Sequence, residues 1–228
     1  MSKSFAAIFD WDGVVVDSSA AHERSWQLLA SEENLPLAEG SFKRGFGRKN
    51  EYIIPHILGW TSGENYPEIV RLGARKEQLY REIVSEFGLE PLPGVRELLE
   101  GLRQENIPSA VGSSTHRANI DLGIKLLRLD GLFSGIVTSE DVREGKPAPE
   151  VFLKAAASVG CEPGCGVVFE DAVVGVKAAL AGGFKVVAVA TTNPEPVLVA
   201  AGAHRVVHRL TRVSAFDVRT LFAGEEVK

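Results

Sequence analysis

The stretch Phe5-Ala-Ala-Ile-Phe9, followed at once by Asp10-Trp-Asp-Gly13, decides the fold of this chain. Five apolar residues in a row, ended by two carboxylates and a glycine, are typical of a strand that is buried on both faces. Similar short apolar runs recur at 108–112, 135–138, 166–169 and 184–190, with amphipathic helical stretches between most of them. Strands that alternate with helices predict a doubly wound α/β domain built on a parallel sheet.

The composition is that of a globular protein. The chain has 228 residues, of which 45% are hydrophobic and 24% charged, enough for one large domain or two modest ones. Lys and Arg together number 25 against 30 Asp and Glu, so we expect neither nucleic acid nor an anionic membrane as a partner. The sequence contains no run of about 18 apolar residues, so we expect no membrane-spanning helix. The two cysteines, Cys161 and Cys165, match neither a zinc site nor a disulfide framework. We therefore expect a cytoplasmic protein, and a monomer.

Residues 18–89 break the alternation of strands and helices. From Tyr66 to Phe87 the apolar residues recur on one helical face, and Ser19–Glu33 also has helical periodicity. A Pro- and Gly-containing linker, 89–94, leads back into the α/β pattern. The sequence therefore predicts an all-helical domain at 18–89, inserted into an α/β core formed by 1–17 and 90–228. We expect the inserted domain to close over the core about hinges near Asp17 and the 89–94 linker.

Polar side chains follow several of the predicted strands. They are Asp10 and Asp12, then Ser113, Ser114 and Thr115, then Lys146, and finally Glu170 and Asp171. In an open parallel sheet, ligands bind beyond the carboxyl ends of the strands, so we expect these groups to converge. Two carboxylates about 4 Å apart repel each other by roughly 4 kcal/mol at an effective dielectric of 20. A divalent cation would offset this repulsion, and ligands that are all oxygen favour Mg²⁺.

A crevice of this composition is suited to a phosphoryl group. Mg²⁺ and Lys146 would offset the charge of the dianion, while Ser113, Ser114 and neighbouring backbone N–H groups would hold its oxygens. One carboxylate could then attack phosphorus, and a second one two residues further on could give a proton to the leaving oxygen. Each signal alone is weak, because a D-x-D-G sequence is often only a turn and Glu-Asp before a helix is often an N-cap. Their order at successive strand ends carries the prediction.

Four segments of the chain together resemble the motifs of the haloacid dehalogenase superfamily. In order, they are Asp10–Ser18, Val111–Ser114, Gly145–Pro149 and Phe169–Asp171. The insertion after the first motif is similar to the helical cap of the β-phosphoglucomutase-like subgroup. The resemblance covers nearly the whole chain and implies an enzyme of phosphoryl transfer, with a Rossmann-like core and a helical cap.

The resemblance also implies how the acidic groups divide the chemistry. Asp10 would be the nucleophile and a metal ligand. Asp12 would be the general acid and base, and would bind the metal through its backbone carbonyl. Asp171 would be a further ligand, with Glu170 beside it in the metal's shell. The chain departs from the pattern at Ala172, where many members carry Ser.

We expect the substrate specificity to depend mainly on residues of the cap. Lys76 interrupts the apolar stripe of its helix, either as a lysine that extends to solvent or as a cation aimed at the substrate. Arg48, in a loop with two glycines, could bind a phosphate bidentately, and Thr115 and Arg117 could complete that distal site. By resemblance, His22 would hydrogen-bond the acid and base network. For Lys76, Arg48 and His22 the plain alternative is a packed or solvated side chain.

These features lead to two enzyme hypotheses. The favoured one is a Mg²⁺-dependent phosphatase of a small phosphorylated sugar or sugar bisphosphate, with water as the final acceptor. The alternative is a phosphomutase of the β-phosphoglucomutase type, in which a sugar hydroxyl accepts the phosphoryl group. A non-catalytic phosphate-binding module is a remote third, because it would be expected to lose a motif carboxylate or Lys146. Trp26 and Trp60 are predicted to lie in the core of the cap, and Trp11 to point away from the crevice.

Overall fold

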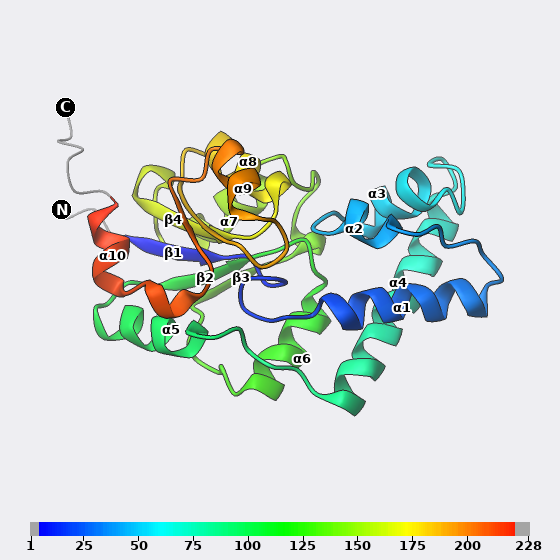
Figure 1. Cartoon of the computed structure of the whole chain (residues 1–228), viewed down its shortest axis with the longest axis horizontal. Coiled ribbons are helices and arrows are strands. Elements are labelled where there is room, and N and C mark those ends of the chain that lie inside the picture. The colour runs from blue at the N-terminus through cyan, green and yellow to red at the C-terminus, as the bar shows by residue number, and fades with distance from the viewer. Residues whose placement is uncertain (1–4, 222–228) are drawn as a thin grey trace.

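The computed structural model of the chain describes residues 5–221. Within this range six parallel strands form one sheet in the order β3-β2-β1-β4-β5-β6 (Figure 1). The strands are β1 (Ala6–Phe9), β2 (Ser109–Gly112), β3 (Gly135–Val137), β4 (Gly166–Glu170), β5 (Lys185–Val189) and β6 (Arg205–Val207). The predicted doubly wound α/β core is confirmed.

The strand order places a switch point between β1 and β4. From β1 the chain moves outward to β2 and β3, then returns to the other side of β1 and continues outward through β4, β5 and β6. Ligands of doubly wound sheets bind at such a point, beyond the carboxyl ends of the strands. Asp10 follows β1 directly and Glu170 ends β4, so both predicted acidic motifs lie at the switch point.

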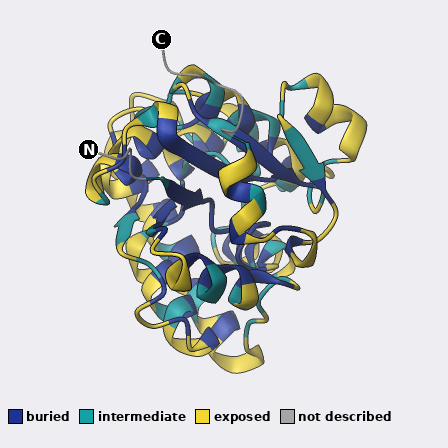
Figure 2. Ribbon diagram, turned by 90° about the vertical axis from the view of Figure 1, so that its left-hand side faces the viewer, coloured by how far each residue is buried: buried dark blue, intermediate teal, exposed yellow. Residues whose placement is uncertain are grey.

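Helices cover both faces of the sheet, and Figure 2 shows the strands mostly buried and the outer faces of the helices exposed. The alternating side chains of each strand divide between two hydrophobic clusters, one per face. One face packs against helices α5 (Val95–Gln104), α6 (Arg117–Leu127) and α10 (Ala215–Thr220). The other packs against α7 (Glu150–Ser158), α8 (Val173–Ala181) and α9 (Glu195–Ala200).

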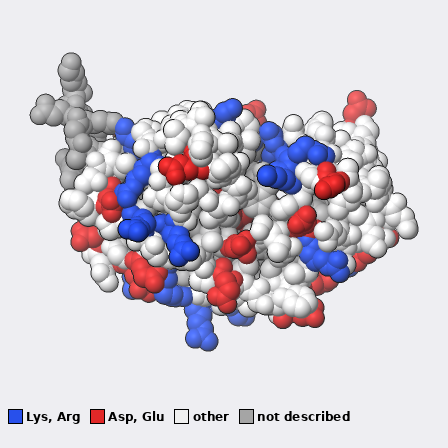
Figure 3. All heavy atoms as spheres, in the orientation of Figure 1, with Lys and Arg blue, Asp and Glu red and all other residues white. Residues whose placement is uncertain are grey.

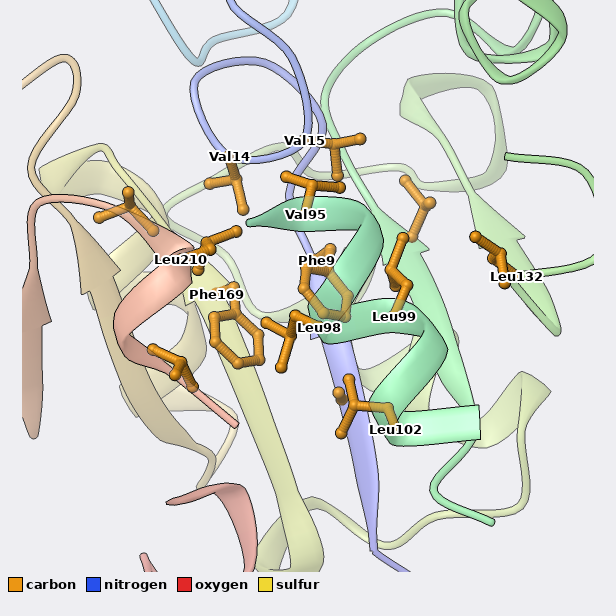
Figure 4. Close-up of a cluster of buried hydrophobic side chains, with 14 of the residues drawn as sticks. Phe9, Val14, Val15, Val95, Leu98, Leu99, Leu102, Leu132, Phe169 and Leu210 are labelled. Atoms are coloured by element: carbon orange, nitrogen blue, oxygen red, sulfur yellow. The ribbon is translucent and has the colours of Figure 1, made fainter. Parts of the chain in front are cut away.

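Aromatic packing holds the centre of the first face. Phe9 on β1 stacks on Phe169 of β4 with ring centroids 4.5 Å apart, and Leu98, Leu99 and Leu102 of α5 lie over them (Figure 4). All five side chains are at most 3% exposed. Burying a large apolar side chain contributes about 1.5–3 kcal/mol, so this cluster fixes the two strands that carry the acidic motifs.

Residues 18–89, all within the described range, form helices and contain no strand. They comprise α1 (Ser19–Glu32), α2 (Ser41–Gly45), α3 (Asn50–Tyr52), a π-helical stretch Ile53–Leu58 and α4 (Tyr66–Phe87). The ends of α4 are those predicted from its apolar periodicity. This helical segment lies beside the sheet and has a separate hydrophobic cluster that includes Trp26 and Leu72 (Figure 1). The division into a core at 1–17 and 90–228 and a cap at 18–89 stays our proposal.

The two connections between the cap and the core run side by side. Val16 and Pro91 form an isolated antiparallel bridge, and the Leu92 N–H donates to the Val15 carbonyl at 2.9 Å. The chain therefore leaves the core and returns to it at neighbouring points. Both lie in or next to the segments predicted as hinges.

Trp11 is fully buried in the core, as expected. Cys161 and Cys165 are both buried and form no disulfide, and burial raises the pKa of the Cys161 thiol to about 11. In the part of the chain described here, no helix combines the length and apolar character needed to cross a membrane. Acidic and basic side chains are interspersed on the face shown in Figure 3, in keeping with the small net charge.

Candidate active site

Asp10 and Lys146 form the centre of the site. The Nζ of Lys146 lies 2.9 Å from Asp10 Oδ2 and 2.6 Å from Glu170 Oε1. Burial alone would lower the pKa of Lys146, but the charges of Asp10 and Glu170 raise it above its usual value. Lys146 therefore stays a cation between two carboxylates, one following β1 and the other ending β4.

Glu170 has every carboxylate oxygen occupied. Besides Lys146 at Oε1, its Oε2 accepts hydrogen bonds from the backbone N–H groups of Asp171 (2.7 Å) and Ala172 (2.6 Å). Gly175 of α8 leaves space for this carboxylate, because a Cβ there would overlap it. Glu170 thus orients Lys146 and the turn after β4, and both of its oxygens are already shared with N–H donors.

Within the described chain, the Asp171 carboxylate is held in place through one of its two oxygens and not through the other. Thr192 donates its hydroxyl to Asp171 Oδ2, and the Asn193 side chain donates to the Asp171 carbonyl at 3.0 Å. Among the described residues, Asp171 Oδ1 is buried with no hydrogen-bond partner. Gly13 has a φ of 76° and packs against this carboxylate so closely that a Cβ would overlap it. The turn after β1 thereby brings Asp171 next to Asp10.

The acidic cluster fits a divalent cation. Asp10, Glu170 and Asp171 each offer an oxygen, and these three atoms lie within 4.8 Å of one another. Burial raises the pKa of Asp10 to about 7, although the charge of Lys146 acts to lower it. Burial also raises the pKa of Asp171 well above its usual range, and the negative charges of Glu170 and Asp10 add to this effect. A second positive charge would keep these carboxylates ionised and would satisfy Asp171 Oδ1. Hard oxygen donors of this kind suit Mg²⁺.

Asp12 lies two residues beyond Asp10, and its side chain turns away from the acidic cluster. Its Oδ1 accepts from the Ser18 hydroxyl and lies 3.2 Å from His22 Nε2, while Oδ2 accepts from the Thr115 hydroxyl. Burial would raise the pKa of Asp12, but His22 and these hydrogen bonds hold it well below its usual range. Asp12 is therefore a carboxylate here. Its side chain is not part of the metal cluster, which leaves its backbone carbonyl as the ligand implied by the resemblance.

A buried polar network extends from Asp12 into the cap. Lys76 Nζ lies 2.7 Å from His22 Nδ1 and 3.0 Å from Glu77 Oε1. Glu77 also accepts from Asn50 at 2.7 Å and from Asn119 at 2.5 Å. Because Asn119 belongs to α6 of the core, the Glu77–Asn119 hydrogen bond crosses from cap to core. The Lys76 side chain is only 4% exposed, so it does not extend to solvent, and its role toward a substrate stays a prediction.

One cavity joins the catalytic residues to the cap. Its core side is formed by Asp10, Asp12 and the loop 113–115, and its cap side by residues of α1, α2, α4 and the segments between them. The predicted residues His22, Arg48, Lys76 and Thr115 all line it. The Arg48 guanidinium lies over the Tyr52 ring, 4.4 Å from the centroid.

Arg117 is the exception among the predicted substrate residues. Its side chain is 52% exposed at the start of α6 and pairs with Asp121 at 2.8 Å, away from the residues that line the cavity within the described chain. Its part in a distal phosphate site stays a prediction. Trp26 has two environments, since it packs in the cap core as predicted and also lines the cavity.

Several site residues were not predicted. Thr192 and Asn193 follow β5, so the strand-end rule that found the other motifs could also have found them. Glu77, Asn50 and Asn119 had no comparable signal, because a buried polar network is formed by residues far apart in sequence.

Comparison with known proteins connects this geometry to a family. Residues 7–189 match the family described as Haloacid dehalogenase-like hydrolase. The chain belongs to this family. The match spans all four motifs from Asp10 to Asp171, so the predicted resemblance is confirmed, and with it the conclusion that the protein is an enzyme.

Relatives within the haloacid dehalogenase-like family carry different activities in their names. The chain is 33% identical over 218 residues to the chloroplastic 5-amino-6-(5-phospho-D-ribitylamino)uracil phosphatase of Arabidopsis thaliana, covering 94% of this chain and 57% of that longer protein. It is 32% identical to the β-phosphoglucomutase of Bacillus subtilis, covering 83% and 84% of the two chains. A solved family IA, variant 3 hydrolase from Entamoeba histolytica superposes with a TM-score of 0.85 at 26% identity, covering 95% and 98%.

Proposed function

We propose that this chain is a Mg²⁺-dependent phosphatase that removes phosphate from a small phosphorylated sugar or polyol through a phosphorylated Asp10. The observation that carries the proposal is the position of Asp10. Its carboxylate faces the cavity, is held by Lys146 at 2.9 Å and lies two residues before a second carboxylate, Asp12. One carboxylate to attack and another to move protons are what two-step phosphate transfer requires.

Asp10 would attack the phosphorus atom of the bound monoester. A bond forms between an Asp10 carboxylate oxygen and phosphorus as the bond to the sugar oxygen breaks. Lys146, with the hydroxyl of Ser113, would hold the phosphoryl oxygens, and Ser113 acts against burial to lower the pKa of Asp10. Asp10, Asp171 and the Asp12 carbonyl would hold Mg²⁺, with Glu170 beside them, and the ion would stabilise the charge that develops on the phosphoryl oxygens.

Asp12 would move the protons. In the first step it would take the proton carried by the bound monoester monoanion and pass it to the departing sugar oxygen. In the second step it takes a proton from the water that attacks the phosphorylated Asp10, and this proton leaves with the released phosphate. The three donors around Asp12, namely Ser18, His22 and Thr115, stabilise the carboxylate form that the second step needs. Transfer to water, which needs no reorientation of a sugar, favours hydrolysis as the overall reaction.

A phosphomutase of the β-phosphoglucomutase type is the second candidate. The similarity to the Bacillus subtilis enzyme over most of both chains favours it, as does Arg48, a cation at the cap side of the same cavity. In that reaction a sugar hydroxyl replaces water as the acceptor. The first chemical step and the residues that carry it are the same.

The test measures turnover and products. Sugar mono- and bisphosphates are incubated with enzyme and Mg²⁺, and phosphate release is recorded for the wild type, for Asp10→Asn and for the exposed control Asp121→Asn. We expect Asp10→Asn to lose at least about 10³-fold in kcat, because it removes the nucleophile, and the control to match the wild type. Persistent turnover by Asp10→Asn would refute the mechanism.

Products separate the two candidates. With β-glucose 1-phosphate and a trace of the 1,6-bisphosphate, a phosphatase releases stoichiometric phosphate. A mutase forms glucose 6-phosphate with little free phosphate, and that outcome would replace hydrolysis by the alternative.

A further inference from the structure

The cap side of the cavity has few polar groups left to offer a substrate. The ammonium of Lys76 is engaged with His22 and Glu77, and also lies 5.2 Å from the centroid of the Trp26 ring. Asn50 donates its amide to Glu77. A substrate whose far end is covered with hydroxyl groups would have to compete with these buried hydrogen bonds.

Apart from Ser41 and from Arg48, whose guanidinium lies over the Tyr52 ring, the remaining side-chain lining of the cap side is apolar. Six side chains from four separate segments contribute to it, namely Trp26, Leu37, Phe42, Phe46, Ile53 and Leu58. Phe42 and Phe46 meet edge to face with centroids 5.4 Å apart, and Trp26 meets Trp60 in the same way at 5.6 Å. These contacts hold the aromatic side chains in fixed positions, so the apolar end has a defined shape before any ligand arrives.

The two ends of the cavity therefore differ in chemistry. The core end, at Asp10 and Ser113 with Lys146 beside Asp10, is charged and suits a phosphate. The cap end is lined by rings and branched aliphatic side chains, against which a sugar hydroxyl would lose hydration without gaining a partner, at a cost of about 1–3 kcal/mol for each unpaired group. Apolar surface buried there is instead favourable.

We infer that the leaving group of the substrate carries a flat, largely apolar ring, such as a heteroaromatic base, at its end away from the phosphate. The inference rests on the proposed phosphatase function and deepens it by naming a substrate class. The polar edge of such a ring would face Ser41, which lines the cavity beside the apolar group, and its faces would pack against Trp26 and Phe46. The phosphorylated carbon chain or sugar would span the distance to Asp10.

Matched substrate pairs test the inference. Ribose 5-phosphate and uridine 5′-monophosphate share the phosphorylated ribose and differ in the base; propyl phosphate and 3-phenylpropyl phosphate differ in a terminal ring. We expect the ring-bearing member of at least one pair to have a kcat/KM higher by about tenfold or more, since the ring buries apolar surface in the complex. Phe46→Ala should reduce that ratio, while the exposed cap control Phe87→Ala keeps it.

The outcomes separate the inference from the proposed function. Ratios below about twofold in both pairs, with sugar phosphates still hydrolysed, would overturn the inference and leave the phosphatase intact. A preference that Phe46→Ala does not change would also overturn it, because the ring would then bind elsewhere. Loss of all turnover with every phosphate monoester would overturn the proposed function itself.

Discussion

The Nζ of Lys76 lies 2.7 Å from Nδ1 of His22. An ammonium group can only donate, so Nδ1 must accept and the ring proton lies on Nε2, which is 3.2 Å from Asp12 Oδ1. The cap lysine thereby fixes which histidine nitrogen donates to the carboxylate that we assign to proton transfer. The imidazole ring of His22 therefore connects Lys76 of the cap to Asp12.

Lys76→Met should free the His22 ring to adopt the other tautomer, in which a lone pair faces Asp12. We expect kcat to fall by about 10²-fold, the lower end of what general acid–base catalysis contributes, with a smaller change in KM. Nitrogen chemical shifts of His22 report the tautomer directly. The exposed Lys125→Met is the control. An unchanged tautomer in folded Lys76→Met would disprove the link.

Gly13→Ala should inactivate the enzyme by displacing Asp171. A Cβ at Gly13 overlaps the Asp171 carboxylate, whereas Gly131 has nearly the same φ (73° against 76°) and open space around it. Gly131→Ala therefore carries the same backbone strain without the collision. We expect both variants to lose similar stability from strain, but only Gly13→Ala to lose at least about 10²-fold in kcat and in Mg²⁺ affinity. Equal activity in the two variants would contradict this role of Gly13.

The thermal stability of the protein offers a test of the metal site that needs no substrate. Because the pKa of folded Asp10 is about 7, above its ordinary 3.8, the metal-free protein loses stability as pH rises from about 4 through about 7. Mg²⁺ should reverse this loss and raise Tm at pH 8 by about 5 °C, with less effect at pH 5.5, where protons compete.

Asp171→Asn should abolish the Mg²⁺-dependent rise in Tm measured by thermal melting. In EDTA the variant should be no less stable than the wild type, because it removes one of several crowded buried charges. The exposed variant Asp121→Asn should keep the full response to Mg²⁺. A full response in Asp171→Asn would place the cation elsewhere.

Glu77 should make folding sensitive to acid. Burial would raise its pKa, but Lys76, His22 and other neighbours lower it from 4.5 to about 2. A depressed pKa of this size corresponds to about 3 kcal/mol of stability, present above about pH 4.5 and lost as pH falls through about 2. Glu77→Gln should be less stable than the wild type at pH 7, and the difference should shrink in acid.

Urea unfolding of the Glu77 variant between pH 2 and pH 7 measures this difference. The exposed Glu86→Gln on the same helix serves as the control and should follow the wild-type curve. A gap between Glu77→Gln and the wild type that stays constant over that pH range would show that Glu77 gains nothing from its ionised form.

The parts of the structure that the sequence predicted best are those governed by local patterns. Continuous apolar runs located five strands, and the 22 residues of α4 were bounded correctly by the period of its apolar face. The sixth strand, β6, was not predicted from the sequence, because it has only three residues, begins with Arg205 and is half-buried at the edge of the sheet. A short edge strand gains its identity from its neighbour β5 rather than from its own composition.

The candidate site divides in the same way. The sequence alone predicted that four residues converge, because the ends of parallel strands meet at one edge of the sheet. They are Asp10, Lys146, Glu170 and Asp171. The contacts of Lys76 could not be predicted in this way, since whether a lysine in an apolar stripe turns to solvent or inward depends on partners from α1 and the next residue along α4. The apolar end of the cavity was also hidden, because its six side chains come from segments joined only by tertiary packing.

The antiparallel bridge between Val16 and Pro91 has a consequence for how enzymes of this architecture diversify. Where a chain exits and re-enters a scaffold at adjacent positions, the intervening segment can be lengthened, shortened or replaced wholesale while the scaffold keeps its register. The strand-end residues that would bind phosphate and metal keep their positions through such a change, whereas the contact of His22 and Lys76 with Asp12 must be retained in the new segment. New specificities could be grafted here by transplanting a single contiguous stretch of gene.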